Sequence, residues 1–127
     1  MSSYIIEGGK RLSGEIDISG SKNASLPILA GSIINGKKVK LYNIPDIDDV
    51  KTTFEILERL GCEIEKKDNY IIINSEEMNE TIIPDELMRK LRSSVILVGA
   101  ILARFKKASF SHPGDCDIWW IHRTSLR

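Results

Sequence analysis

The segment that most constrains the fold spans residues 22–34, because most side chains from Ala24 onward in it are apolar. Gly20 and Ser21 precede it and can turn the chain into a helix. Pro27 falls within the first turns of that helix, where a missing amide hydrogen costs least. A helix that is apolar almost all round needs to be covered on most of its surface. We therefore predict a buried helix that other elements enclose.

Alternating polar and apolar residues predict strands before and after this helix, and an amphipathic pattern predicts a second helix that ends at Gly61. Three acidic residues, Asp46, Asp48 and Asp49, lie at the start of the second helix. We interpret them as an N-cap and first turn rather than as metal ligands. Two more strands follow. The predicted unit is βαβαββ, with strands at residues 15–18, 38–42, 62–65 and 70–74.

The same order of elements begins again in the second half of the chain, which makes the predicted fold class α/β. A short strand candidate at residues 81–83 precedes a long helix ending near Phe105, where Arg104 is expected to interact with the helix dipole. Shifting the chain by 69 positions places residues 37–41 on residues 106–110. The identities are few, so chance agreement is an alternative, but the shared order predicts an internal repeat whose second copy is incomplete.

Composition argues against several classes of partner. The 18 basic and 18 acidic side chains balance and form no dense basic block, so we expect neither nucleic acid nor a membrane as a partner. No segment reaches the length of a membrane span and the N-terminus lacks a signal-peptide pattern, so we expect a cytoplasmic protein. Cys62 and Cys116 lie in unlike contexts, and we expect reduced thiols rather than a disulfide or a metal site.

A loop at residues 111–116 presents the thiol of Cys116 just after a strand-like run. A thiol acts as an acid or nucleophile only where its pKa is tuned, and a turn that happens to contain a cysteine is the alternative. Lys22 and Asn23 open the buried helix, and Arg92 lies in a later helical pattern. Together these residues predict an anion site with a proton donor. The alternative is that Lys22 and Arg92 are ordinary solvent-exposed basic side chains.

The chain resembles the enolpyruvyl transferase family over nearly all of its length through Ile118. The similarity is carried by motifs at residues 5–8, 12–15, 18–30, 43–45, 49–50, 60–61, 88–94, 99–104 and 113–118. The resemblance implies an α/β fold of βαβαββ repeat units, of the inside-out α/β barrel type, and an incomplete set of those units in this chain.

The resemblance also implies a reaction. The enolpyruvyl group of phosphoenolpyruvate would pass to the 3-hydroxyl of UDP-N-acetylglucosamine with release of phosphate, the first committed step of peptidoglycan precursor synthesis. These two small molecules are the implied partners, and no metal or organic cofactor is implied. Lys22 and Asn23 match residues that contact phosphoenolpyruvate, Arg92 matches a phosphate or nucleotide-sugar contact, and Cys116 matches the loop cysteine that donates a proton. Such chemistry needs a proton for the methylene carbon and fixed cations for the phosphate.

The chain departs from the family pattern near its end. Asp115 stands where family members usually carry glycine, and residues 119–127 form a divergent tail in place of the segment that grips the nucleotide. A shifted or cut reading frame after Ile118 would explain that tail. Family chains are much longer and have two domains, so residues 1–21 would belong to a strand of the second domain and residues 22–118 to part of the first.

We therefore expect the isolated chain to be inactive, because the base that takes the sugar hydroxyl proton lies in the missing part. Two alternatives stay open. One is a noncatalytic fragment that binds anions, and the other is a related enolpyruvyl transferase acting on shikimate phosphate. The loop that carries Cys116 argues against the shikimate enzyme.

Overall fold

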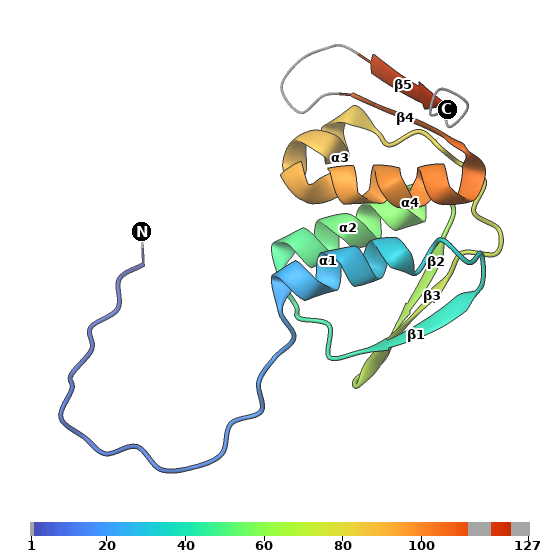
Figure 1. The fold of residues 1–127 in the computed structure, drawn as a ribbon. Helices are drawn as coiled ribbons and strands as arrows, with labels where there is room; N and C mark the ends of the chain where they lie inside the picture. The colour runs from blue at the N-terminus through green and yellow to red at the C-terminus, as the bar shows by residue number, and fades with distance from the viewer. Residues whose placement is uncertain (1, 112–117, 123–127) are drawn as a thin grey trace.

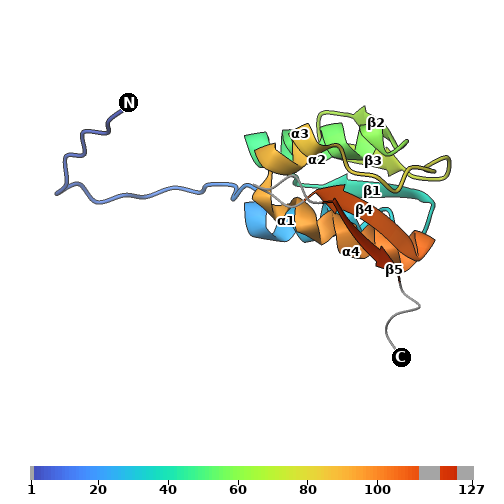
Figure 2. The same ribbon diagram turned by 90° about the horizontal axis from the view of Figure 1, so that it is seen from above.

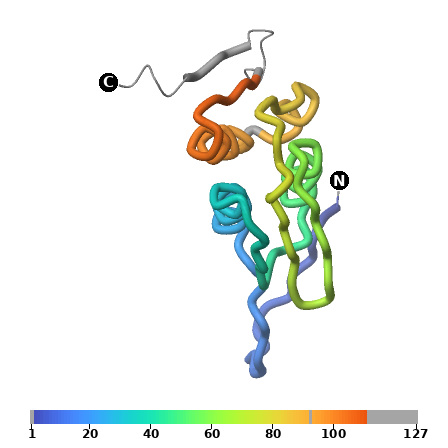
Figure 3. Tube along the Cα trace, turned by 90° about the vertical axis from the view of Figure 1, so that its right-hand side faces the viewer, coloured from blue at the N-terminus to red at the C-terminus, as the bar shows by residue number. Residues whose placement is uncertain are grey.

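The structure is a computed structural model that describes residues 2–111 and 118–122. The helices lie between two antiparallel sheets, one of three strands and one of two (Figure 1). In the end-on view, α1 lies beside α4 and α2 beside α3 (Figure 3). In chain order the elements are α1 (Lys22–Gly31), β1 (Lys38–Tyr42), α2 (Asp48–Arg59), β2 (Glu63–Lys66), β3 (Tyr70–Asn74), α3 (Asp85–Lys90), η1 (Arg92–Ser94), α4 (Val95–Phe105), β4 (Lys107–Ser111) and β5 (Ile118–His122).

The three-stranded sheet has the order β1-β3-β2, and both pairings are antiparallel. Ile73 of the central strand pairs with Val39 on one side and with Ile64 on the other. Since side chains alternate across a strand, this row faces the helices, and Ile73 is fully buried. The strands predicted at residues 38–42 and 70–74 are confirmed, and the strand predicted at residues 62–65 begins one residue later.

The core is built from the facing sides of the helices and the inner row of the sheet. Side chains from α1, α2, β3 and α4 meet there with no exposed surface: Leu29, Leu57, Ile73 and Ile101. The helix predicted over residues 22–34 ends at Gly31, and its burial holds for only one side, because Ile28 remains 48% exposed and Ile34, beyond the helix end, 47%. Within residues 2–111 and 118–122, α1 packs mainly against α2 and α4.

No strand forms at residues 15–18, where the alternation predicted one. Residues 2–20 contain no helix or strand and run away from the body (Figure 2). Ile16 and Ile18 are 87% and 82% exposed. A period-two pattern stabilises a strand only when a neighbour pairs with its backbone and an apolar surface covers one face. The described part of the chain supplies neither here, so the predicted βαβαββ unit appears as αβαββ.

The long helix predicted to end near Phe105 does end there, but it is broken into α3, η1 and α4. The break falls at Leu91, which has extended backbone angles and a side chain only 4% exposed. Ser94 stabilises it, because its hydroxyl donates to the Leu91 carbonyl at 2.6 Å. The strand predicted at residues 81–83 is reduced to one parallel bridge between Ile82 and Ser109.

The last residues take part in the second sheet. β5 pairs with β4 in an antiparallel register that sets Ala108 opposite Ile121. No folding role is predicted for this tail, because its two adjacent tryptophans follow no period long enough to interpret. The loop between the two strands, residues 112–117, lies outside the described residues.

Candidate functional site

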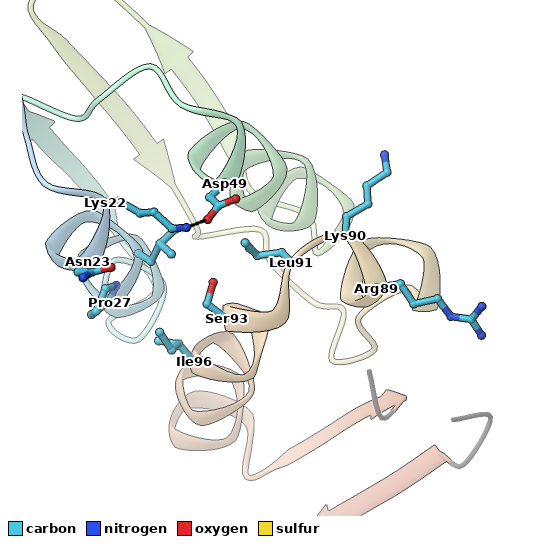
Figure 4. Close-up of a pocket in the computed structure, with 10 residues that line it drawn as sticks. Lys22, Asn23, Pro27, Asp49, Arg89, Lys90, Leu91, Ser93 and Ile96 are labelled. Carbon is cyan, nitrogen blue, oxygen red and sulfur yellow. Dashed lines mark ion pairs between the residues drawn. The ribbon is translucent and has the colours of Figure 1, made fainter. Parts of the chain in front are cut away.

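A cavity of about 620 Å³ lies where the starts of α1 and α2 meet η1 and the start of α4 (Figure 4). The end of α3 forms its rim. The first turn of every helix leaves backbone amide groups without intrahelical partners and carries the positive end of the helix dipole. The cavity therefore lies at an electropositive junction. Its lining residues are Lys22, Asn23, Leu26, Pro27, Asp49, Arg89, Lys90, Leu91, Ser93 and Ile96.

Lys22 is the first residue of α1, and its position is fixed by the helix cap. The Ser21 hydroxyl accepts a hydrogen bond from the amide of Ala24 at 3.4 Å, and the Ser25 hydroxyl donates to the Ser21 carbonyl at 2.7 Å. The Lys22 ammonium forms an ion pair with the carboxylate of Asp49 (Figure 4). Lys22 and Asn23, which the sequence assigns to one site, both line this cavity, and their role in binding an anion stays a prediction.

Asp49 is a cavity residue that sequence reasoning missed. It lies in the first turn of α2, where the acidic residues were interpreted as capping groups. The first-turn placement of Asp48 and Asp49 is confirmed, but the N-cap is Ile47 and makes no side-chain hydrogen bond to the helix. Asp46 instead pairs with Lys51 at 3.1 Å. The pairing of Asp49 with Lys22 depends on how α1 packs against α2, and no local pattern reveals that packing.

Of the other two predicted site residues, the structure describes the backbone of Arg92 and does not describe Cys116. The backbone of Arg92 begins η1 between Leu91 and Ser93, and both of those neighbours line the cavity. Cys116 lies outside the described residues, so its predicted role as proton donor stays a prediction. In the part of the chain that is described, no three His, Cys, Asp or Glu side chains form a group that would hold a metal ion.

Two further basic residues reach the rim of the cavity from the end of α3. The side chains of Arg89 and Lys90 point away from Lys22 (Figure 4). The Lys90 ammonium lies 3.8 Å from the carboxylate of Glu55. Lys22 is therefore the lysine aimed at the junction of the helix starts, and Asp49 neutralises its charge there.

Cys62 and Arg104 lie away from this cavity. Cys62 is 5% exposed, and burial raises the pKa of its thiol to about 11, against a smaller lowering by the charge of Arg104. Arg104 lies in the last turn of α4, as predicted, and donates from Nη1 to the carbonyl of Ile33 at 3.1 Å. This hydrogen bond therefore connects α4 to the chain just beyond the end of α1.

Comparison with known proteins identifies the family. The family model for EPSP synthase (3-phosphoshikimate 1-carboxyvinyltransferase) matches residues 6–119. The chain belongs to this family. The resemblance to enolpyruvyl transferases that the sequence motifs indicated is thereby confirmed.

Relatives with assigned names support a narrower similarity. The chain is 45% identical to UDP-N-acetylglucosamine 1-carboxyvinyltransferase 2 of Caldanaerobacter subterraneus, over 93% of this chain and 28% of that protein. It is 47% identical to UDP-N-acetylglucosamine 1-carboxyvinyltransferase of Pseudothermotoga lettingae, with the same coverage of both proteins. The protein of that name from Campylobacter jejuni is 41% identical over 89% of this chain and 27% of its own length. The chain thus spans less than a third of the length of these family members.

A solved structure supports the fold. The enolpyruvyl transferase NikO from Streptomyces tendae superposes with a TM-score of 0.70 over 85% of this chain and 25% of that protein, at 24% identity. The predicted α/β class therefore agrees with a known member of this fold. Among the helices in residues 2–111, none is long and apolar enough to cross a membrane.

Proposed function

We propose that this chain forms part of the phosphoenolpyruvate site of a UDP-N-acetylglucosamine 1-carboxyvinyltransferase. The observation that carries the proposal is the cavity at the helix starts, which Lys22 and Asn23 both line. Helix starts bind phosphate through free amides, and a lysine ammonium adds a point charge to them. The names of the relatives that are 41–47% identical support this substrate class.

The proposed residue roles follow from the chemistry of the transfer. The sugar hydroxyl oxygen adds to the enol carbon of phosphoenolpyruvate, a base takes the hydroxyl proton, and Cys116 gives a proton to the methylene carbon. Loss of phosphate and of one methyl proton then restores the double bond. Lys22, with Asn23, holds the phosphate, and Arg92 supplies a second contact to phosphate or nucleotide sugar. Fixed cations stabilise the charge that grows as phosphate leaves.

Turnover needs more protein than this chain contains, because a transition state is stabilised only when groups on all sides of it are in place. We assign residues 22–118 to part of a first domain, residues 1–21 to a strand of a second domain and residues 119–127 to a divergent tail. The same proposal includes a cytoplasmic location. The isolated chain then binds anions without catalysis. The shikimate alternative is not favoured, because the relatives compared above carry the UDP-N-acetylglucosamine name.

A chimera tests the proposed activity. Residues 1–118 replace the matching segment of the Caldanaerobacter relative, and phosphate release from phosphoenolpyruvate is measured with UDP-N-acetylglucosamine or shikimate 3-phosphate as acceptor. We expect release with the nucleotide sugar, a loss of at least about a hundredfold in Lys22→Ala, since a lost transition-state contact to charge costs that much, and little change in Lys38→Ala. The isolated 127-residue chain should release none.

Other outcomes of the same assay separate the alternatives. Release that depends on shikimate 3-phosphate would support the shikimate enzyme. A folded chimera that is inactive with both acceptors would leave the noncatalytic anion-binding alternative. Activity that is equal in Lys22→Ala and Lys38→Ala would contradict the role given to Lys22.

A further inference from the structure

We propose that Asp49 is a built-in counter-ion that competes with the anionic substrate for Lys22 and so limits how tightly the cavity binds multiply charged anions. The inference rests on the proposed function, because it assumes that an anion binds beside Lys22. It assigns a specificity-determining role to an acidic residue that lies in the cavity without being a predicted substrate contact.

The geometry supports competition. Asp49 and Lys22 belong to different helices, and their ion pair spans the space where the starts of α1 and α2 meet (Figure 4). Asp49 is the less exposed partner, at 31% of its side chain against 53% for Lys22. A carboxylate held at the first turn of α2 is itself an anion at a helix start. Asp49 thus occupies, from within the chain, the kind of position that a phosphate would take.

The charge balance explains why this matters for specificity. Lys22 and Asp49 together contribute no net charge to the junction, and the Arg89 and Lys90 side chains point elsewhere. An anion that reaches the Lys22 ammonium also comes close to the Asp49 carboxylate. Coulomb repulsion scales with the product of the charges, so a dianion is repelled twice as strongly as a monoanion at the same place. Because half-exposed ion pairs are weak, Lys22 can still exchange partners.

A neighbouring residue provides a matched control. Asp48 lies in the same first turn of α2 and carries the same charge, but its side chain is exposed and does not line the cavity. Within the described residues it makes no ion pair. Asp48→Asn therefore changes the net charge and the helix start as Asp49→Asn does, and leaves the partner of Lys22 in place.

The experiment titrates the 127-residue chain with methyl phosphate, a dianion at pH 8, and with dimethyl phosphate, a monoanion, at constant ionic strength. Binding is followed by the amide NMR signals of Lys22 and Asn23. We expect Asp49→Asn to tighten methyl phosphate about fivefold and dimethyl phosphate about twofold, as the charge product requires. Asp48→Asn should change either affinity by much less. Asp49→Ser, which also removes the charge, should reproduce the result.

The possible failures are distinguishable. If Lys22→Ala binds methyl phosphate as well as the parent chain does, the anion site of the proposed function is wrong and the inference falls with it. If binding depends on Lys22 but Asp49→Asn leaves it unchanged or weakens it, the counter-ion role alone is wrong, and Asp49 positions Lys22 instead. If Asp49→Asn raised the affinities for methyl phosphate and dimethyl phosphate by the same factor, the charge-based specificity would also be overturned.

Discussion

Burial governs the chemistry of Cys62 more than its place in any motif. The side chain is 5% exposed, and its pKa is raised to about 11 because burial disfavours the charged thiolate. The nearby charge of Arg104 lowers that pKa by a smaller amount. Since the thiolate is the reactive form, Cys62 is inert at neutral pH. The residue therefore acts as a small apolar side chain of the core.

The raised pKa makes stability depend on alkaline pH. The unfolded state loses the Cys62 proton at its ordinary pKa of 9.0, whereas the folded state keeps it until about 11. The contribution of this group is therefore complete below pH 9 and is lost as pH rises through 11. We expect the free energy of unfolding of the parent chain to fall more steeply over that range than that of Cys62→Ala. Urea unfolding at several pH values measures this, and parallel curves would contradict it.

Single residues also show what the sequence could and could not indicate about the site. Lys22 and Asn23 follow a turn and open an apolar helix, so local sequence places both at a helix start. Asp49 has the same local signature as any acidic residue in a first turn. Its pairing with Lys22 arises from the packing of α1 against α2, which depends on side chains distributed along both helices.

Among the helices and strands, a prediction is confirmed where the described chain supplies the pairing partner that the sequence pattern needs. β1 and β3 lie at the predicted residues because they pair with each other and cover the helices. The alternation at residues 15–18 is equally regular, but the described chain offers it no partner. The break at Leu91 is not predicted by any Gly or Pro at that position. It depends on the hydroxyl of Ser94 and on the burial of Leu91.

The positions of the helices and strands also change the alignment between the two copies of the predicted repeat. A shift of 69 residues aligns the start of β1 with that of β4, at Lys38 and Lys107. Burial in the two helical regions agrees instead at a shift of 68, which sets the partly exposed residues Ile28 and Ile96 together. The buried pairs Leu29 with Leu97 and Ile33 with Ile101 agree at the same shift. The repeat remains a prediction, and the helix–strand connection of its second copy would be one residue longer.

Arg104 of α4 bonds to the chain just beyond the end of α1, and its loss should cost stability. Arg104→Ala removes a charged donor from the Ile33 carbonyl and leaves that carbonyl without the bond. We expect the free energy of unfolding to fall by about 1–2 kcal/mol, as for a partly buried hydrogen bond to a charged group. The control is Arg59→Ala, whose exposed pairing with Glu86 at 3.8 Å should contribute less than about 0.5 kcal/mol. Equal losses in urea unfolding would argue against the linking role.

At the scale of the whole molecule, the N-terminal segment, residues 2–20, makes few contacts with the rest of the fold. Tyr4, Ile6 and Leu12 are each at least 88% exposed. The hydrogen bonds to the body begin at Ile18, whose carbonyl accepts from the side-chain amide of Asn43 at 3.5 Å, and continue at Gly20, whose amide donates to the Asn43 side-chain oxygen at 3.1 Å. The apolar residues of the segment therefore contribute nothing to the core that the structure describes.

Truncation tests this independence. Deleting residues 2–17 should change the free energy of unfolding by less than about 0.5 kcal/mol, as for surface changes that touch no packed group. Extending the deletion through Ser21 removes the N-cap of α1 as well and should cost about 1 kcal/mol more. Urea unfolding of both truncated chains gives the comparison. A large loss from the shorter deletion would show that the segment packs on the body in solution.

All three strands of the first sheet lie within residues 38–74, which has a consequence for folding during synthesis. Among the described strands, β1, β2 and β3 pair with one another, and α2, which lies between β1 and β2 in the chain, packs against α1. This part can therefore fold on the ribosome before the rest is translated. Until α4 is translated, Leu29 of α1 and Ile33 just beyond that helix lack one of the helices that pack on this part of the fold. The nascent chain thus passes through a stage with exposed apolar surface, and we expect chaperones to bind it then.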